Sequence, residues 1–202
     1  MEPKDNKKER NAKVDRKTSE TEVFLYLSLD RDRKVDIETP SGFFNHMLEL
    51  FSYHARLHIM LRANGDIEVD DHHLVEDVGL VMGEAFKKAI GKKENINRYG
   101  SMILPMDEAL VMVALDFSGR SYLNFNVSFP TEKIGDFDVE LIREFFEAFV
   151  RESGLTLHIK KLEGENGHHI AEAIFKGFGR GIKEAVSENL GDEGVPSTKG
   201  RL

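Results

Sequence analysis

Two segments of the chain repeat one pattern at a fixed distance, and this internal repeat constrains the fold more than any other feature. A shift of 96 residues lays the His-His-x-x-Glu motif of residues 72–76 over the same motif at residues 168–172. Apolar residues at helical spacing follow both motifs, and they superpose at the same shift. The repeat predicts two related halves that each end in an amphipathic helix.

Apolar periodicity predicts the other elements of both halves. In the first half we expect strands at 22–29, 35–38, 57–63 and 67–69, and helices around 44–51 and from His72 to Ile90, with Asp71 as capping residue. In the second half we expect strands at 102–104, 109–117, 121–129 and 155–160, and helices at 139–151 and 168–186. The halves themselves should span residues 16–92 and 93–187. Residues 1–15 are almost wholly polar, so we expect a flexible tail there.

The repeated polar residues suit metal binding. Successive helical residues point about 100° apart, so His72 and His73 should address different ions, whereas His72 and Glu76 share a face. Imidazole nitrogen with carboxylate oxygen suits Mn, Fe, Co, Ni or Zn, and the residue types alone do not choose among these metals. One such histidine pair could be a chance surface pair, but two pairs with the same glutamate at one shift favour a site. The chain has no Cys, so a thiolate zinc site and a disulfide framework are excluded.

Charge and hydropathy exclude several other classes of function. The chain has 28 Lys and Arg against 36 Asp and Glu, a net charge of -8, which argues against a nucleic-acid partner. We find no segment that resembles a signal peptide and no apolar run of about 18 residues, so no membrane association is expected. We therefore expect a soluble cytoplasmic protein.

The remaining histidines are ambiguous when each is taken alone. His46 precedes an apolar helical stretch and is either a ligand or a helix-capping residue. His54 fits an exposed position at a helix end, where its charge would complement the helix dipole. His58 and His158 lie in the matching triplets Leu-His-Ile and fit solvent-facing strand positions.

At a larger scale, six short motifs appear in a fixed order from about Arg16 to Leu202. They are Asn45-His46-Met47-Leu48 with His54, Asp71-His72-His73-x-x-Glu76-Asp77, Arg98-Tyr99-Gly100, Ser118-Gly119-Arg120, Gly167-His168-His169-x-x-Glu172 and Pro196-Ser197-x-Lys199-Gly200. In combination they resemble the imidazoleglycerol-phosphate dehydratase family, although each motif alone is weak.

The resemblance implies a fold, an activity, a cofactor and an assembly. The fold would be α+β, with two tandem βαββα-like halves of the ribosomal protein S5 domain 2 type. The activity would be that of a lyase in L-histidine biosynthesis, which dehydrates D-erythro-imidazole glycerol phosphate to imidazole acetol phosphate. Two Mn²⁺ ions per active site would bind the imidazole ring, and sites between subunits of a 24-subunit particle are implied. The implied metal ligands are His46, His72, His73, Glu76, Glu144, His168, His169 and Glu172.

The same resemblance assigns roles around the substrate. Glu20 would be the acid/base, with Glu76 and Glu172 as further catalytic residues. The substrate would also contact Arg98, Arg120, Ser197, Thr198 and Lys199, the last three from a C-terminal tail at 188–202. Arginine offers paired planar donors to phosphate and lysine a point charge.

Two positions depart from the family pattern. The family usually has histidine where this chain has Glu144, and often has Asp where this chain has Asn45. A carboxylate is itself a competent ligand, whereas Asn45 would weaken a hydrogen bond to His46. Two other classes of function stay open: a metal-dependent hydrolase, and a metal-binding protein without catalysis.

Overall fold

The computed structural model describes residues 9–189 and 194–197, which form two halves with the same order of elements apart from one extra hairpin in the second. The first half comprises β1 (Asn11–Lys17), β2 (Thr21–Ser28), β3 (Lys34–Glu38), α1 (Gly42–Ala55), β4 (His58–Gly65) and α2 (His72–Ile90). The second half comprises β5 (Tyr99–Met106), β6 (Ala109–Asp116), β7 (Tyr122–Asn126), the short strands β8 (Lys133–Ile134) and β9 (Phe137–Asp138), α3 (Glu140–Ser153), β10 (Thr156–Glu163) and α4 (Gly167–Val186). The expected α+β fold of two tandem halves is confirmed.

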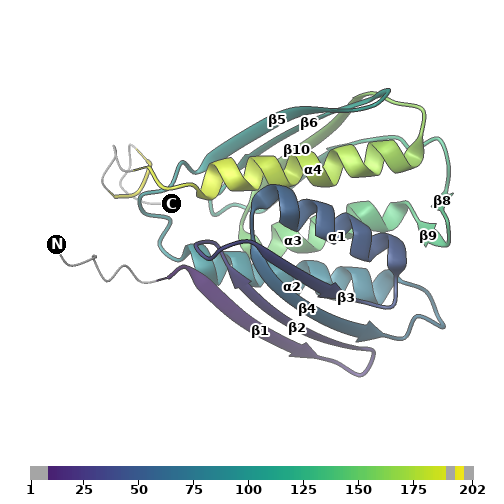
Figure 1. Cartoon of the computed structure of the whole chain (residues 1–202), viewed down its shortest axis with the longest axis horizontal. Coiled ribbons are helices and arrows are strands. Elements are labelled where there is room, and N and C mark those ends of the chain that lie inside the picture. Colours follow the sequence, from purple (N-terminus) through teal and green to yellow (C-terminus); the bar gives the residue numbers. More distant parts are fainter. Residues whose placement is uncertain (1–8, 190–193, 198–202) are drawn as a thin grey trace.

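Each half contributes one mixed sheet, with strand orders β1-β2-β4-β3 and β5-β6-β10-β7. In the first sheet, β4 pairs antiparallel with β2 and parallel with β3. In the second sheet, β10 pairs antiparallel with β6 and parallel with β7. The helices lie between the two sheets (Figure 1), where α2 packs on α3 and α1 packs on α4. Because each pair joins helices from different halves, the halves share one core and fold as one unit.

The repeated glycines allow these helix pairs to approach closely. A methyl group on Gly83 of α2 would lie 2.5 Å from the carbonyl oxygen of Phe149 in α3. A methyl group on Gly179 of α4 would lie equally close, 2.5 Å, to the carbonyl oxygen of Phe51 in α1. Glycine is therefore required at both positions because backbone meets backbone there.

The structure corrects several expectations for single elements. Residues 11–15 belong to β1 and not to a flexible tail, because Ala12 and Val14 are buried against the core while the backbone pairs with β2. Residues 67–69 form a turn and not a strand. Their alternating apolar pattern does not reflect burial, because Ile67 and Val69 are both exposed. The β8–β9 hairpin was not predicted. Instead of the βαββα-like order, the first half has the order βββαβα, and the second half has the same order with the β8–β9 hairpin inserted before α3.

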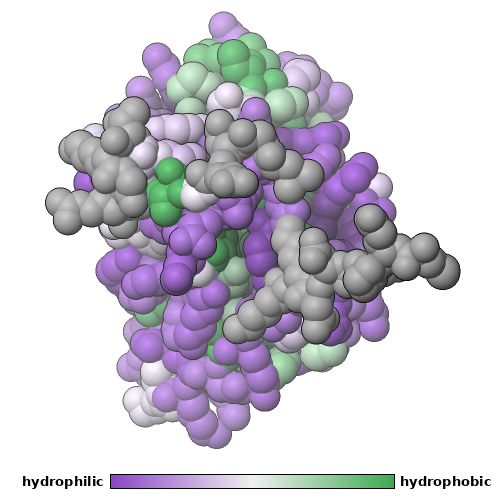
Figure 2. Space-filling model, turned by 90° about the vertical axis from the view of Figure 1, so that its left-hand side faces the viewer, coloured by the Kyte–Doolittle hydropathy of each residue, from purple (hydrophilic) through white to green (hydrophobic). Residues whose placement is uncertain are grey.

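On the face that Figure 2 shows, the surface is mostly polar, and an apolar patch lies at its upper edge. The sheet containing β5 lies at that edge in Figure 1, and it exposes the apolar side chains Ile103 of β5 and Leu162 of β10. Within the described residues, none of the helices combines the length and the apolar composition needed to cross a membrane.

Candidate metal centre

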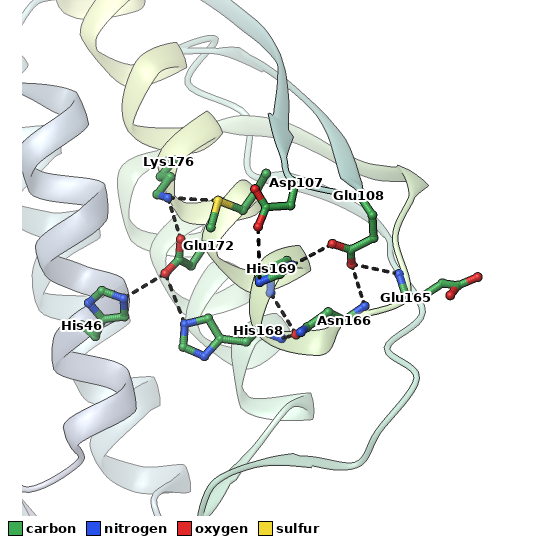
Figure 3. Close-up of polar contacts among 10 residues, drawn as sticks. His46, Asp107, Glu108, Glu165, Asn166, His168, His169, Glu172 and Lys176 are labelled. Carbon is green, nitrogen blue, oxygen red and sulfur yellow. Dashed lines mark hydrogen bonds and ion pairs between the residues drawn. The ribbon is translucent and has the colours of Figure 1, made fainter.

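The start of α4 positions two adjacent histidines on different sides of the helix. The Asn166 side chain caps this helix by accepting the backbone N–H groups of His168, at 2.9 Å, and His169, at 3.4 Å. Because neighbouring helical residues point about 100° apart, His168 faces α1 while His169 faces the β5–β6 turn (Figure 3). One capped helix end therefore offers two imidazoles to two separate environments.

His168 meets His46 and Glu172 in a compact cluster. The Oε1 atom of Glu172 lies 3.0 Å from Nε2 of His46 and 3.2 Å from Nε2 of His168 (Figure 3). One ligand atom from each residue lies within 4.8 Å of the others, and in the described part of the chain this is the one group of at least three His, Cys, Asp or Glu residues with such spacing. The glutamate is buried, whereas both histidines are partly exposed.

Lys176 lies one helical turn after Glu172, and no role was predicted for it from the sequence. The spacing of four residues could have predicted the ion pair between them. Its Nζ atom donates to Oε2 of Glu172 at 2.5 Å. Burial alone would raise the pKa of Glu172, but hydrogen bonds from Lys176, His46 and His168 outweigh it and hold the pKa at about 2. The cluster therefore keeps an ionised carboxylate between two imidazoles.

This donor set fits a divalent transition metal. Two imidazole nitrogens and one carboxylate oxygen already converge on one point, and the carboxylate stays ionised as a ligand must. Both ring nitrogens lie within hydrogen-bond distance of the carboxylate oxygen, so the three donor atoms already surround the point that an ion would take. No ion identity follows from these residues alone.

The second histidine of α4 has its own carboxylate partner. Nδ1 of His169 lies 2.7 Å from Oε2 of Glu108 in the β5–β6 turn. This hydrogen bond is the main reason why the pKa of His169 is raised and that of Glu108 is lowered to about 2. Asp107 lies on the other side of the ring, with Oδ2 at 3.8 Å from Nε2. Neither Asp107 nor Glu108 was assigned a role from the sequence.

The first half of the repeat arranges its residues differently. Nδ1 of His73 lies 3.1 Å from Asp66 and 3.8 Å from Glu20, so both carboxylates face the second histidine of α2. Glu76 accepts a hydrogen bond from Arg151 at 2.7 Å, and the ring of His72 stands edge-on to that of His73. Within the described chain, these residues do not join the cluster around Glu172.

Asp71 and Asn45, which precede expected ligand histidines, have other partners than the sequence suggested. Asp71 does not cap α2 with its side chain; its neighbour Asp70 accepts the N–H of His72 at 2.7 Å, and Asp71 accepts the hydroxyl of Ser41. The Asn45 amide makes two hydrogen bonds with the backbone of Thr39, so it fixes the entry into α1 and does not orient His46.

Glu144, the remaining expected ligand, lies on α3. It lines a cavity of about 720 Å³ together with other acidic residues of α3 and with the residues around β9. The structure does not bring its side chain into the group formed by His46, His168 and Glu172.

Three of the expected phosphate ligands lie at the opposite end of the helices: Arg98, Arg120 and Ser197. Arg98 is buried, holds Asp116 at 2.7 and 3.0 Å, and donates to the carbonyl oxygen of Pro196. Arg120 is exposed nearby, and Ser197 follows Pro196 directly. Thr198 and Lys199 lie outside the described residues.

Lys93 is a further cationic residue at this end that was not predicted from the sequence. Lys93 is half-buried, and burial lowers its pKa; among the charged neighbours, Asp116 raises it while Arg98 and Arg120 lower it. The arrangement concentrates positive charge in a protein that is acidic as a whole, which is what a phosphate group requires.

The two clusters are far apart within one chain. The backbone N–H of Arg98 donates to the carbonyl oxygen of Ala185, near the end of α4, whereas His168 lies at its beginning. At 1.5 Å per residue, these 17 residues separate the two clusters by about 25 Å (Figure 1).

Comparisons with known proteins agree in pointing to one family. A family model described as imidazoleglycerol-phosphate dehydratase matches residues 39–182. Curated relatives of that name come from Caldicellulosiruptor bescii, 54% identical over 194 residues (96% of this chain, 99% of the relative), and from Oceanobacillus iheyensis, 52% identical over 193 residues (96% and 100%).

Solved structures of such dehydratases have a closely similar fold. The protein from Staphylococcus aureus gives a TM-score of 0.81 at 41% identity, over 89% of this chain and 99% of that one. The protein from Pyrococcus furiosus, solved in complex with (S)-C348, gives 0.81 at 38% identity, over 94% and 100%.

Proposed function

The chain belongs to the imidazoleglycerol-phosphate dehydratase family of enzymes, and from that membership we propose its detailed reaction. It is the dehydration of D-erythro-imidazole glycerol phosphate to imidazole acetol phosphate, a step of L-histidine biosynthesis in the cytoplasm. We propose two Mn²⁺ ions per active site as cofactors. The observation that carries the proposal is the convergence of His46, His168 and Glu172 from two helices on one point.

The proposed ligands form two groups. His46, His168 and Glu172 would hold one ion, and the others would complete the two sites: His72, His73, Glu76, Glu144 and His169. When bound, such ions supply Lewis acidity and a template that orients an azole ring. The ionised carboxylate of Glu172 and the imidazoles beside it provide nitrogen and oxygen donors for that purpose.

The reaction requires a group that moves a proton. Water forms from the hydroxyl on the carbon that bears the ring and from the hydrogen on the next carbon, which leaves an enol that becomes the ketone. We assign this proton transfer to Glu20, whose half-exposed carboxylate lies in the β1–β2 turn, 3.8 Å from Nδ1 of His73. Its position beside a proposed metal ligand supports the assignment.

The phosphate would be bound by Arg98, Arg120, Ser197, Thr198 and Lys199. About 25 Å separates the residues near Arg98 from those near His168, far more than an imidazole ring, a three-carbon chain and a phosphate can span. This separation supports active sites built from more than one copy of the chain, and we propose self-assembly into a 24-subunit particle.

A product assay tests the reaction against its alternatives. Incubation with imidazole glycerol phosphate and Mn²⁺ should yield imidazole acetol phosphate, and chelation of the metal should stop the reaction. A hydrolase would release inorganic phosphate, and a protein that only binds metal would leave the substrate intact. Either of these results would refute the proposal.

Complementation between two variants with different defects tests the shared site. His168→Ala should lose Mn²⁺ and activity, whereas Arg120→Ala should keep Mn²⁺ and raise KM by at least tenfold. Arg143→Ala, which removes an exposed arginine paired with Glu147 on α3, is the matched control and should behave as wild type. If sites combine residues of different copies, reassembly of the first two variants together should restore part of the activity; no recovery would contradict a shared site.

A further inference from the structure

The turns of the first hairpins in the two halves are counterparts. β2 and β6 begin 88 residues apart, and their buried positions superpose at this shift, Val23 on Val111 and Leu25 on Val113. The residue that precedes each strand is a glutamate, Glu20 in the first half and Glu108 in the second. Both carboxylates reach the second histidine of the helix that closes their half.

The two counterparts differ in how closely they hold that histidine. Oε2 of Glu108 lies 2.7 Å from Nδ1 of His169, whereas Oε2 of Glu20 lies 3.8 Å from Nδ1 of His73. In the first half a different residue, Asp66, occupies the close position at 3.1 Å. His73 and His169 therefore each have one carboxylate close to Nδ1. In the second half that carboxylate belongs to the hairpin residue Glu108, whereas in the first half it belongs to Asp66 and not to the hairpin residue Glu20.

Three hydrogen bonds fix the Glu108 carboxylate itself. Besides the contact with His169, Oε1 accepts the backbone N–H of Asn166 at 2.8 Å and that of Glu165 at 3.3 Å (Figure 3). An ionised carboxylate can only accept, so the proton shared with the ring lies on Nδ1. The neutral ring then has an unprotonated Nε2, which faces away from Glu108.

We propose that Glu108 is a positioning residue for metal binding: it keeps the proton of His169 on Nδ1 and so presents Nε2 to a divalent cation. Asp66 has the same role for His73, which leaves Glu20 available for the substrate. The proposal rests on the proposed metal-dependent function and extends it to two acidic residues that are not themselves ligands. A hydrogen bond of this kind fixes both the tautomer and the orientation of a ligand histidine.

The main competing role for Glu108 is structural, because it also ties down the loop before α4. Glu108→Gln separates the two roles. The amide oxygen can still accept the N–H groups of Asn166 and Glu165, but the amide NH₂ donates to Nδ1 and moves the ring proton to Nε2, where it blocks a metal. Glu165→Gln is the matched control, since its exposed side chain in the same loop points away from the cluster (Figure 3).

The experiment titrates Mn²⁺ alone into metal-free, full-length protein by calorimetry. Glu108→Gln should weaken Mn²⁺ binding by roughly 10- to 100-fold at the site that His169 joins, and Asp66→Asn should do so at the site that His73 joins, while Glu165→Gln binds as wild type. In ¹⁵N-labelled protein, the ring nitrogen shifts of His169 should report a proton on Nδ1 in the wild type and on Nε2 in Glu108→Gln.

The outcomes are distinct. Wild-type affinity in Glu108→Gln, an equal loss in Glu165→Gln, or no Mn²⁺ binding by the wild type would overturn the positioning role. A lower melting temperature of Glu108→Gln with unchanged affinity would leave only the structural role and would overturn it too. Because no substrate is present, an absence of dehydratase activity alongside the expected affinities would refute the proposed reaction and not this inference.

Discussion

Adding one methyl group at Gly179 should disturb the metal centre from a distance. A Cβ atom there would lie 2.5 Å from the carbonyl oxygen of Phe51, whereas C–H···O contacts need about 3.3 Å, so α1 and α4 must separate by about 0.8 Å. Overpacking of this kind costs about 1–3 kcal/mol, and the better helix propensity of alanine returns about 1 kcal/mol. We expect a net loss of up to about 2 kcal/mol, which would lower the melting temperature by at most roughly 4–8 °C.

The displacement reaches the metal centre because the same two helices carry it. His46 lies on α1 and Glu172 on α4, and the helices are rigid over the turns that separate these residues from the clash. Metal–ligand distances tolerate only about 0.2 Å, several times less than the expected shift. Gly179→Ala should therefore weaken Mn²⁺ binding at this cluster by roughly tenfold or more.

Gly83→Ala is a matched control, since its Cβ would also lie 2.5 Å from a backbone oxygen, but between α2 and α3. It should lose similar stability without moving His46 relative to Glu172. The assay combines thermal unfolding of metal-free protein with Mn²⁺ titration of both variants. Wild-type affinity in Gly179→Ala, or an equal loss of affinity at this cluster in Gly83→Ala, would refute the reasoning.

Three further changes test other parts of the structure. Asp77→Ala removes the buried acceptor of Thr21 and Arg16 and should lower the free energy of unfolding in urea by about 2–3 kcal/mol; no loss would show that the network is dispensable. Asn166→Ala removes the cap of α4 and should cost about 1 kcal/mol in the same measurement, and a neutral effect would argue against the cap. Burial, followed by nearby cationic side chains, lowers the pKa of His54, so the unfolded state binds the proton more readily and stability should fall as pH drops below 6.5. His54→Gln should reduce the difference in stability between pH 7 and pH 5, and an unchanged difference would contradict that linkage.

The sequence was most informative where local pattern and chemistry coincide. The extent of α2 from His72 to Ile90 follows from apolar spacing, and the duplicated His-His-x-x-Glu motif indicates metal chemistry. Prediction failed where side chains alternate without being buried, as at residues 67–69, and where a polar segment gains its structure from pairing, as at 11–15. The strand at 11–15 depends on its pairing with residues 24–28 of β2, whereas residues 66–69 are closed into a turn by a hydrogen bond from the N–H of Val69 to the carbonyl oxygen of Asp66.

The sequence by itself determined that two related halves exist, that each ends in an amphipathic helix, and that nitrogen and oxygen ligands lie in the first turns of each helix. Only the tertiary structure decided that His46 joins His168 and Glu172, because the approach of α1 to α4 depends on a glycine contact two turns away. It also decided that Glu108 and Asp66, and not residues at matching places in the repeat, hold Nδ1 of the second histidines. Helical periodicity fixes the direction of a side chain from its own helix, but the partner that it meets depends on how separate elements pack.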